Sequence, residues 1–168
     1  MNIFNNMKIF IILTAIFLIY ITYKDSFKSY KVIHIVDGDT IVIDYKGKHE
    51  KVRFIGVDCP ESVHMDPSKN NKWGEASSKF TKKLLQNKKV TLEFDKEKRD
   101  KYGRLLAYVY INKKMVNELL LEKGYAVPMF IKPNYKYKEN FKEIHKKALK
   151  SKKGNFADKK YLKMIGIK

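Results

Sequence analysis

Five short β-type runs between residues 30 and 111 limit most strongly the fold that this chain can adopt. The first three are rich in valine and isoleucine, and a Tyr-Lys-Gly-Lys turn separates the second from the third. The fourth alternates apolar and polar residues with a period of two. The runs are Tyr30–Val36, Thr40–Tyr45, Glu50–Val57, Lys89–Asp95 and Arg104–Ile111. We therefore expect a meander of three strands followed by two more.

Three other segments have the spacing of amphipathic helices, and glycines follow two of them as C-caps. They lie around Ala76–Leu84, Met115–Leu120 and Phe141–Leu149. This order of elements predicts an α+β, mainly β, fold: a five-stranded OB-type barrel with three α-helices packed outside it. The lysine-rich stretch from Gly154 onward is expected to be a loosely held tail.

An almost uninterrupted apolar run, Ile9–Tyr23, precedes the strands. As a helix it would span roughly 22 Å, short of the ~30 Å hydrocarbon core, which fits a signal-peptide core or a short anchor better than a buried core helix. No small-x-small pair follows it, so an uncleaved anchor is at least as plausible as a removed signal. We expect a signal or anchor over 1–29, the OB-type domain over 30–158 and a basic tail over 159–168. The protein would then be membrane-anchored and facing outside the cytoplasm, or secreted.

The charge balance indicates a polyanionic partner. Lysine and arginine total 36 against 18 acidic residues, a net charge of +18, and residues 1–29 contribute only three Lys and one Asp to it. A polyanion such as nucleic acid, or an anionic lipid surface, would complement this charge. The hydrophobic content of 44% excludes a disordered polycation.

Two acidic clusters stand where the first and third β-type runs end. Asp39 lies just beyond the first run and Asp58 directly follows the third, and their hard anionic oxygens suit Ca²⁺ or Mg²⁺. The alternative is structural, since Asp-Gly forms turns and an aspartate near Pro60 can cap one. Both readings remain open for each cluster taken alone.

Glu61 and two of the three arginines complete a candidate phosphodiesterase site. Glu61, three residues beyond Asp58, could take a proton from a water that attacks phosphorus, or it could be a solvated loop residue. Arg53 and Arg104 lie in apolar runs and could hold a phosphate in bidentate fashion. A barrel-rim ion pair with an aspartate is the alternative for each arginine.

Four motifs stand in the order and approximate spacing of the thermonuclease (staphylococcal nuclease-like) family, and together they make a specific signal. The resemblance extends over about Tyr30–Asp158. The motifs are Asp37-Gly38-Asp39-Thr40, Arg53 with Val57-Asp58-Cys59-Pro60-Glu61, Trp73-Gly74-Glu75-Ala76-Ser77, and Asp100-Lys101-Tyr102-Gly103-Arg104-Leu105-Leu106-Ala107-Tyr108.

The resemblance implies a five-stranded OB barrel with three helices and a Ca²⁺-dependent endonuclease that hydrolyses DNA and RNA to 3′-phosphorylated products. The resemblance also implies a role for each site residue. Asp39 and Asp58 would bind Ca²⁺ by side chain and Cys59 by its carbonyl, while Arg53 and Arg104 would bind the scissile phosphate. Glu61 would be the general base, and Lys101 and Tyr102 would contact a neighbouring phosphate.

The chain departs from the family pattern in two places. Cys59 replaces a threonine, but a backbone carbonyl does not depend on its side chain, so Ca²⁺ binding should survive. The segment Ala126–Pro133 lacks the two tyrosines that pack against the nucleotide in the best-known member. It offers Met129, Phe130 or Ile131 instead, and we expect Phe130 to stack on a base.

We expect a monomer that prefers single-stranded DNA and RNA, with the membrane as a further partner if the apolar segment is retained. The main alternative is a non-hydrolytic nucleic-acid-binding module of the same fold. Such modules typically lose the catalytic acidic and arginine residues, which this chain keeps. A basic protein that only engages anionic lipid would leave Asp39, Asp58 and Glu61 without a role.

Overall fold

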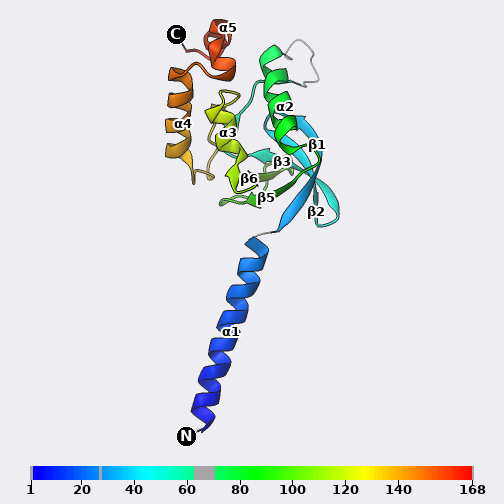
Figure 1. Cartoon of the computed structure of the whole chain (residues 1–168), viewed down its shortest axis with the longest axis vertical. Helices are drawn as coiled ribbons and strands as arrows, with labels where there is room; N and C mark the ends of the chain where they lie inside the picture. Colours follow the sequence, from blue (N-terminus) through cyan, green and yellow to red (C-terminus); the bar gives the residue numbers. More distant parts are fainter. Residues whose placement is uncertain (1, 27, 63–70, 168) are drawn as a thin grey trace.

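A closed five-stranded barrel forms the centre of the protein, whose computed structural model describes residues 2–26, 28–62 and 71–167 (Figure 1). Its first three strands form an antiparallel meander, β5 pairs with β1, and β6 pairs with β5. A parallel pairing of β3 with β6 closes the barrel and confirms the expected OB-type architecture. The five strands are β1 (Ser29–Asp37), β2 (Thr40–Tyr45), β3 (Lys48–Phe54), β5 (Lys89–Glu93) and β6 (Leu105–Ile111).

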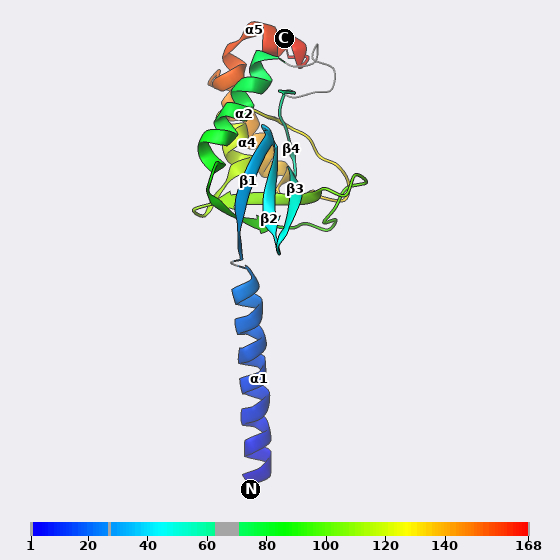
Figure 2. The ribbon, with the colours of Figure 1, turned by 90° about the vertical axis from the view of Figure 1, so that its right-hand side faces the viewer.

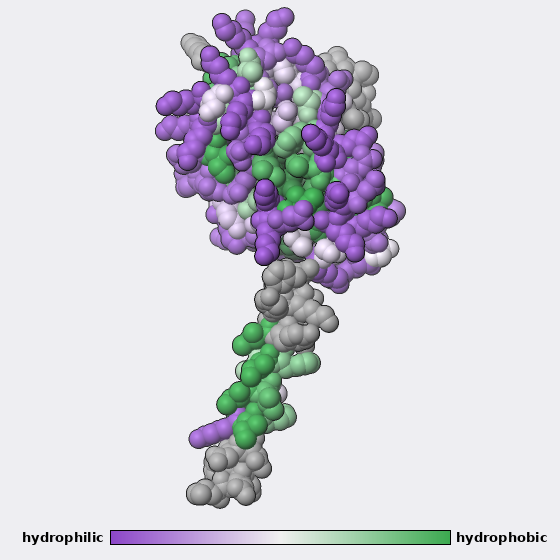
Figure 3. Space-filling model, in the orientation of Figure 1, coloured by the Kyte–Doolittle hydropathy of each residue, from purple (hydrophilic) through white to green (hydrophobic). Residues whose placement is uncertain are grey.

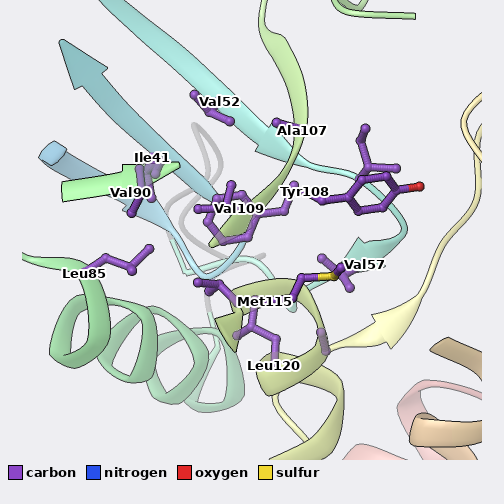
Figure 4. Packing of buried hydrophobic residues seen from close by; sticks show 14 of the residues in the cluster. Ile41, Val52, Val57, Leu85, Val90, Ala107, Tyr108, Val109, Met115 and Leu120 are labelled. Atoms are coloured by element: carbon purple, nitrogen blue, oxygen red, sulfur yellow. The ribbon is translucent and has the colours of Figure 1, made fainter. Parts of the chain in front are cut away.

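Three α-helices pack outside the barrel, as expected from the apolar spacing. They are α2 (Lys72–Leu85), α3 (Val116–Glu122) and α4 (Lys138–Lys150). Short strands add to the main ones: β7 (Lys114–Met115) extends the sheet, and β4 (Val57–Asp58) pairs with β8 (Val127–Pro128). The main core fills the barrel and the space beneath α2 and α3, with Ile41, Val52, Ala107, Val109 and Leu120 fully buried (Figure 4).

The third strand ends earlier than the sequence pattern predicts. We expected it to run through Val57, but β3 stops at Phe54, and the chain turns at Gly56, whose φ is +79°. A Cβ at Gly56 would lie 2.8 Å from the Phe141 ring, so glycine is required both by conformation and by space. The turn directs Val57 and Asp58 into β4, away from the barrel sheet.

The C-terminal segment is not a loosely held tail, and that expectation was wrong for residues 154–167. It folds into a 3₁₀ turn, η2 (Gly154–Ala157), and a short helix, α5 (Lys159–Met164). Phe156 and Tyr161 are almost completely buried in a second small core, and the rings of Trp73 and Tyr161 lie 5.5 Å apart. The lysines seen in the sequence lie on the outside of this folded segment, which is why composition alone suggested a tail.

Asp158 joins this segment to α2, and protonation of its carboxylate should change the fluorescence of Trp73. Its carboxylate accepts hydrogen bonds from Lys72 Nζ at 2.6 Å and from Trp73 Nε1 at 3.1 Å, and Lys72 holds the pKa of Asp158 down at about 2. Because folding lowers the pKa of Asp158, its carboxylate stabilises the folded protein at any pH above the ordinary pKa of 3.8. This stabilisation is lost as the pH falls from 3.8 through the lower pKa of the folded state.

We therefore expect Asp158→Asn to loosen the α2–α5 contact at neutral pH, and the difference from wild type to vanish as pH falls from about 4 to about 2. Fluorescence of Trp73, the single tryptophan, reports the contact directly. An acid titration with the same transition in both proteins would contradict the assigned role of Asp158.

The N-terminal helix α1 (Asn2–Ser26) projects away from the barrel (Figures 1 and 2). Its described side chains from Met7 to Ile19 are all exposed, and they form the green stretch below the largely hydrophilic domain in Figure 3. Among the helices in the described ranges, none combines the length and apolarity needed to cross a membrane.

Candidate active site

The two acidic clusters lie side by side at one end of the barrel. Asp39 sits in the turn between β1 and β2, and its backbone carbonyl accepts a hydrogen bond from Phe54 N at the end of β3. Its Oδ2 atom accepts a hydrogen bond of 2.7 Å from Cys59 N in the other cluster. Folding therefore joins two motifs that are 20 residues apart in the sequence.

Arg53 places one guanidinium between the two carboxylates. Its Nη2 atom is 2.8 Å from Asp58 Oδ1 and 3.3 Å from Asp39 Oδ2. Its Nη1 atom donates to the carbonyls of Phe54 at 2.9 Å and Val57 at 2.6 Å, so the Gly56 turn also holds the arginine in place. The ion pair that the sequence offered as an alternative is present, and it brings Asp39 and Asp58 to the same point.

This cluster has more buried negative charge than its arginine offsets. Burial raises the pKa of Asp39, and the nearby Arg53 acts in the opposite direction. Burial also raises the pKa of Asp58, although half of that side chain remains exposed. A third carboxylate, Asp37, lies beside them and accepts hydrogen bonds from Gly38 N at 2.7 Å and Ser62 Oγ at 2.5 Å. An added cation would therefore be favourable at this point.

The donor set fits a hard divalent cation. Asp39 and Asp58 present carboxylate oxygens that converge on a single nitrogen, so one ion could contact both. Within the described ranges, three or more His, Cys, Asp or Glu side chains do not gather into a metal-binding group. Ca²⁺ and Mg²⁺ tolerate this because they also take backbone carbonyls and water as ligands. Burial raises the pKa of the Cys59 thiol well above its ordinary value, so only its backbone is suited to a hard cation.

A pocket of about 450 Å³ brings the two arginines together. Arg53 and Arg104 both line it, along with Lys101 and Tyr102. Arg104 lies just before β6, and its Cζ atom is 5.7 Å from the centre of the Tyr102 ring. Four of the predicted site residues therefore border one cavity, and three of these four carry a positive charge, which suits a phosphodiester chain.

Sequence reasoning missed Asp100, which orients Arg104. Its Oδ2 atom accepts a hydrogen bond of 2.7 Å from Arg104 Nε, and its Oδ1 atom accepts 3.0 Å bonds from the backbone N–H groups of Tyr102 and Arg104. Gly103, with a φ of +80°, closes the turn. The sequence signal for this contact is an aspartate four residues before an arginine, with a glycine between them.

The far wall of the pocket comes from the segment that follows β8. Met129 and Ile131 line the pocket, and the Ile131 side chain is exposed. Phe130 does not line it: its ring lies 6.4 Å from that of Phe141 and packs against the main core. Asn134, also missed from the sequence, anchors this wall by bonding both the N–H and the carbonyl of Glu97 at 2.9 Å.

Glu61 lies at the edge of the cluster, beyond β4. The residue is exposed, and its backbone carbonyl accepts a hydrogen bond of 3.3 Å from Asn71 N. It is not among the residues that line the pocket, whereas Arg53 belongs to both the pocket and the carboxylate cluster. Arg53 therefore stands between the Asp39 and Asp58 carboxylates and the pocket that carries Arg104.

The barrel carries this carboxylate cluster beside a pocket lined by two arginines, an arrangement suited to binding a phosphodiester. The family model described as staphylococcal nuclease homologue matches residues 51–158. A thermonuclease of Staphylococcus hyicus is 48% identical over 126 residues, which cover 75% of this chain and 74% of that protein. The chain belongs to the staphylococcal nuclease family and is a nuclease.

Two further relatives support the assignment. A thermonuclease of Staphylococcus intermedius is 46% identical over 123 residues, 73% of each chain. The endonuclease YncB of Bacillus subtilis (strain 168) is 47% identical over 109 residues, 64% of this chain and 51% of that protein. The predicted thermonuclease-like family is thereby confirmed, whereas the roles of the individual residues stay predictions.

Proposed function

We propose that this nuclease is a Ca²⁺-dependent endonuclease that hydrolyses single-stranded DNA and RNA to products with 3′-phosphate ends. The observation that carries the proposal is the convergence of Asp39 and Asp58 on Arg53, at the border of the pocket that holds Arg104. Carboxylates for a hard cation and arginines for a phosphate therefore meet at one point.

Asp39 and Asp58 would hold the Ca²⁺ by side chain and Cys59 by its carbonyl, and the bound ion would supply positive charge beside the scissile phosphate. Arg53 and Arg104 would bind the non-bridging phosphate oxygens. Because negative charge on these oxygens grows in the pentacoordinate transition state, the arginines would bind that state more tightly than the substrate. Asp100 would keep Arg104 oriented for this task.

Glu61 would act as the general base. Its carboxylate would take a proton from a water molecule while the water oxygen forms a bond to phosphorus. The bond between phosphorus and the 5′ oxygen would break, and that oxygen would leave as a 5′-hydroxyl after gaining a proton. The phosphate would remain on the 3′ side.

The pocket would hold the nucleotide next to the cut. Lys101 and Tyr102, both exposed on the pocket border, would contact a neighbouring phosphate. Met129 and Ile131 would form the apolar wall against the base, with Phe130 supporting that wall from the core side. A base can enter such a pocket only when it is unstacked, which favours single strands.

A cleavage assay of the full chain tests this function. Single-stranded DNA and RNA of defined sequence would be incubated in Ca²⁺, in Mg²⁺ or in EGTA, and the product ends would be mapped. We expect 3′-phosphate and 5′-hydroxyl ends in Ca²⁺ and no products in EGTA. Salt-sensitive binding without products in Ca²⁺ would contradict the proposal and favour a non-hydrolytic binding module instead.

We further propose that the enzyme works as a monomer outside the cytoplasm, secreted or held at a membrane by residues 1–29. The barrel topology is compatible with a tether, because α1 and the site lie at opposite ends of β1. At the α1 end, the ring centres of Tyr30 and Tyr45 are 4.9 Å apart. At the other end, beside the site, Asp37 pairs with Thr40. Fractionation of cells that express the full chain, followed by light scattering of the purified protein, tests both points. Activity confined to the cytoplasm would contradict this localisation.

A further inference from the structure

The first turn of α2 lies directly on the backbone of the residue proposed as the general base. Gly74, in that turn, is buried, and a Cβ added to it would come 2.2 Å from Glu61 O and 2.4 Å from Glu61 C. It would also come 2.7 Å from Pro60 O. Its φ is not in the left-handed region, so glycine is needed here for space and not for conformation.

The turn that carries Glu61 is also held from the opposite side. Ser62, the next residue, donates a hydrogen bond of 2.5 Å to Asp37 at the end of β1, next to the turn that bears Asp39. On the α2 side, Asn71 N donates to Glu61 O, while the Asn71 side chain caps the helix through Trp73 N and Gly74 N. The Glu61 backbone is therefore held between α2 and the carboxylate cluster.

The helix itself cannot move aside easily. Trp73 Nε1 donates to Asp158, and Ser77 Oγ donates to Tyr125 O at 2.7 Å. The Trp73 ring also packs on Tyr161 of α5. A side chain at position 74 would therefore push the Pro60–Glu61 turn, which is exposed on its outer side, and leave α2 where it is.

We propose that Gly74 is a positioning residue for Glu61: the missing side chain allows α2 to support the Glu61 backbone by direct contact. The inference rests on the proposed role of Glu61 as general base. Gly74 does not line the pocket, and a side chain there would first meet the Pro60–Glu61 backbone, so we expect its effect on turnover to pass through Glu61. A displacement of about 1 Å at a reacting group can lower turnover about 10²-fold.

A double-mutant cycle tests this dependence in the full chain, with Gly74→Ala, Glu61→Gln and the double variant assayed on single-stranded DNA in saturating Ca²⁺. We expect Gly74→Ala alone to lower kcat by about 10²-fold with KM almost unchanged. In the Glu61→Gln background the same change should have no further effect, because the misplaced group no longer takes part.

Gly47→Ala is the matched control, because Gly47 has a φ of +81° and no atom within 4 Å of an added Cβ. This variant should lose stability through backbone strain and keep its kcat. A loss of kcat by the same factor in both Glu61 backgrounds would overturn the positioning role of Gly74. If Glu61→Gln alone kept full activity, the proposed base, and not only its positioning, would be refuted.

Trp73→Phe provides a second route if Gly74→Ala does not fold. The change keeps an aromatic ring beside Tyr161 but removes the 3.1 Å hydrogen bond to Asp158, which loosens the first turn of α2. We expect a several-fold loss of kcat that is absent in the Glu61→Gln background. An equal loss in both backgrounds would contradict the inference.

Discussion

Arg53→Ala is expected to lower turnover by about 10³-fold or more and to lower the free energy of unfolding by about 3 kcal/mol in EGTA. The activity is lost because the guanidinium that would bind the transition-state phosphate is gone. The stability is lost because Asp39 stays buried without its positive partner. The loss of stability is no larger because Asp58 is half exposed, and water can solvate its carboxylate once Arg53 is gone.

Ca²⁺ should separate these two effects of Arg53→Ala. The ion would supply the missing positive charge to Asp39 and Asp58, so in Ca²⁺ the variant should regain much of the lost stability while its turnover stays far below that of the wild type. Urea denaturation and single-turnover cleavage, each with Ca²⁺ and with EGTA, measure the two quantities. Arg99→Ala is the stability control: Arg99 pairs with Glu50 at the surface and its side chain is 44% exposed, so we expect a much smaller loss of stability than for Arg53→Ala. Turnover of Arg53→Ala equal to that of the wild type in Ca²⁺ would contradict the phosphate-binding role.

Glu61→Gln is expected to lower kcat by about 10² to 10⁴-fold, because the amide cannot accept the proton of the attacking water. Since Glu61 is exposed, the free energy of unfolding should change by less than about 0.5 kcal/mol. Steady-state cleavage with saturating substrate and Ca²⁺ measures the effect.

Glu75→Gln is the matched control for this variant. Glu75 is an exposed glutamate in the first turn of α2, close to Gly74 in sequence, and the same chemical change there should leave kcat unchanged. Equal activity of the Glu61→Gln variant and the wild type would exclude Glu61 as the base.

The barrel could be predicted from the sequence because local patterns determine it. The Val- and Ile-rich runs became β1, β2 and β3, and the period-two run became β5. The early end of β3 could not be predicted from these patterns, because Ile55 and Val57 are apolar like the strand before them. The left-handed turn at Gly56 and its contact with Phe141 come from tertiary packing that the local pattern does not contain.

The charged residues of the candidate site could be picked out from the sequence, whereas the residues that position them could not. Asp39, Asp58, Arg53 and Arg104 stand out because charges near apolar strands need an explanation. The supports, including Asp100, Asn134 and Gly74, act through contacts between segments that the chain brings together only on folding. The stacking of Phe130 on a base stays a prediction; the sequence did not indicate that its ring would lie 6.4 Å from that of Phe141.

Calorimetric titration of Ca²⁺ into the wild type and into Asp39→Asn tests the central claim most directly, because it measures the cation site without relying on turnover. We expect one Ca²⁺ per wild-type chain and binding at least about tenfold weaker in Asp39→Asn, since a neutral amide replaces a charged ligand. Glu75→Asn, which removes an exposed carboxylate outside the cluster, should bind as the wild type does. Equal Ca²⁺ affinity in the wild type and in Asp39→Asn would contradict a cation site built on Asp39 and Asp58.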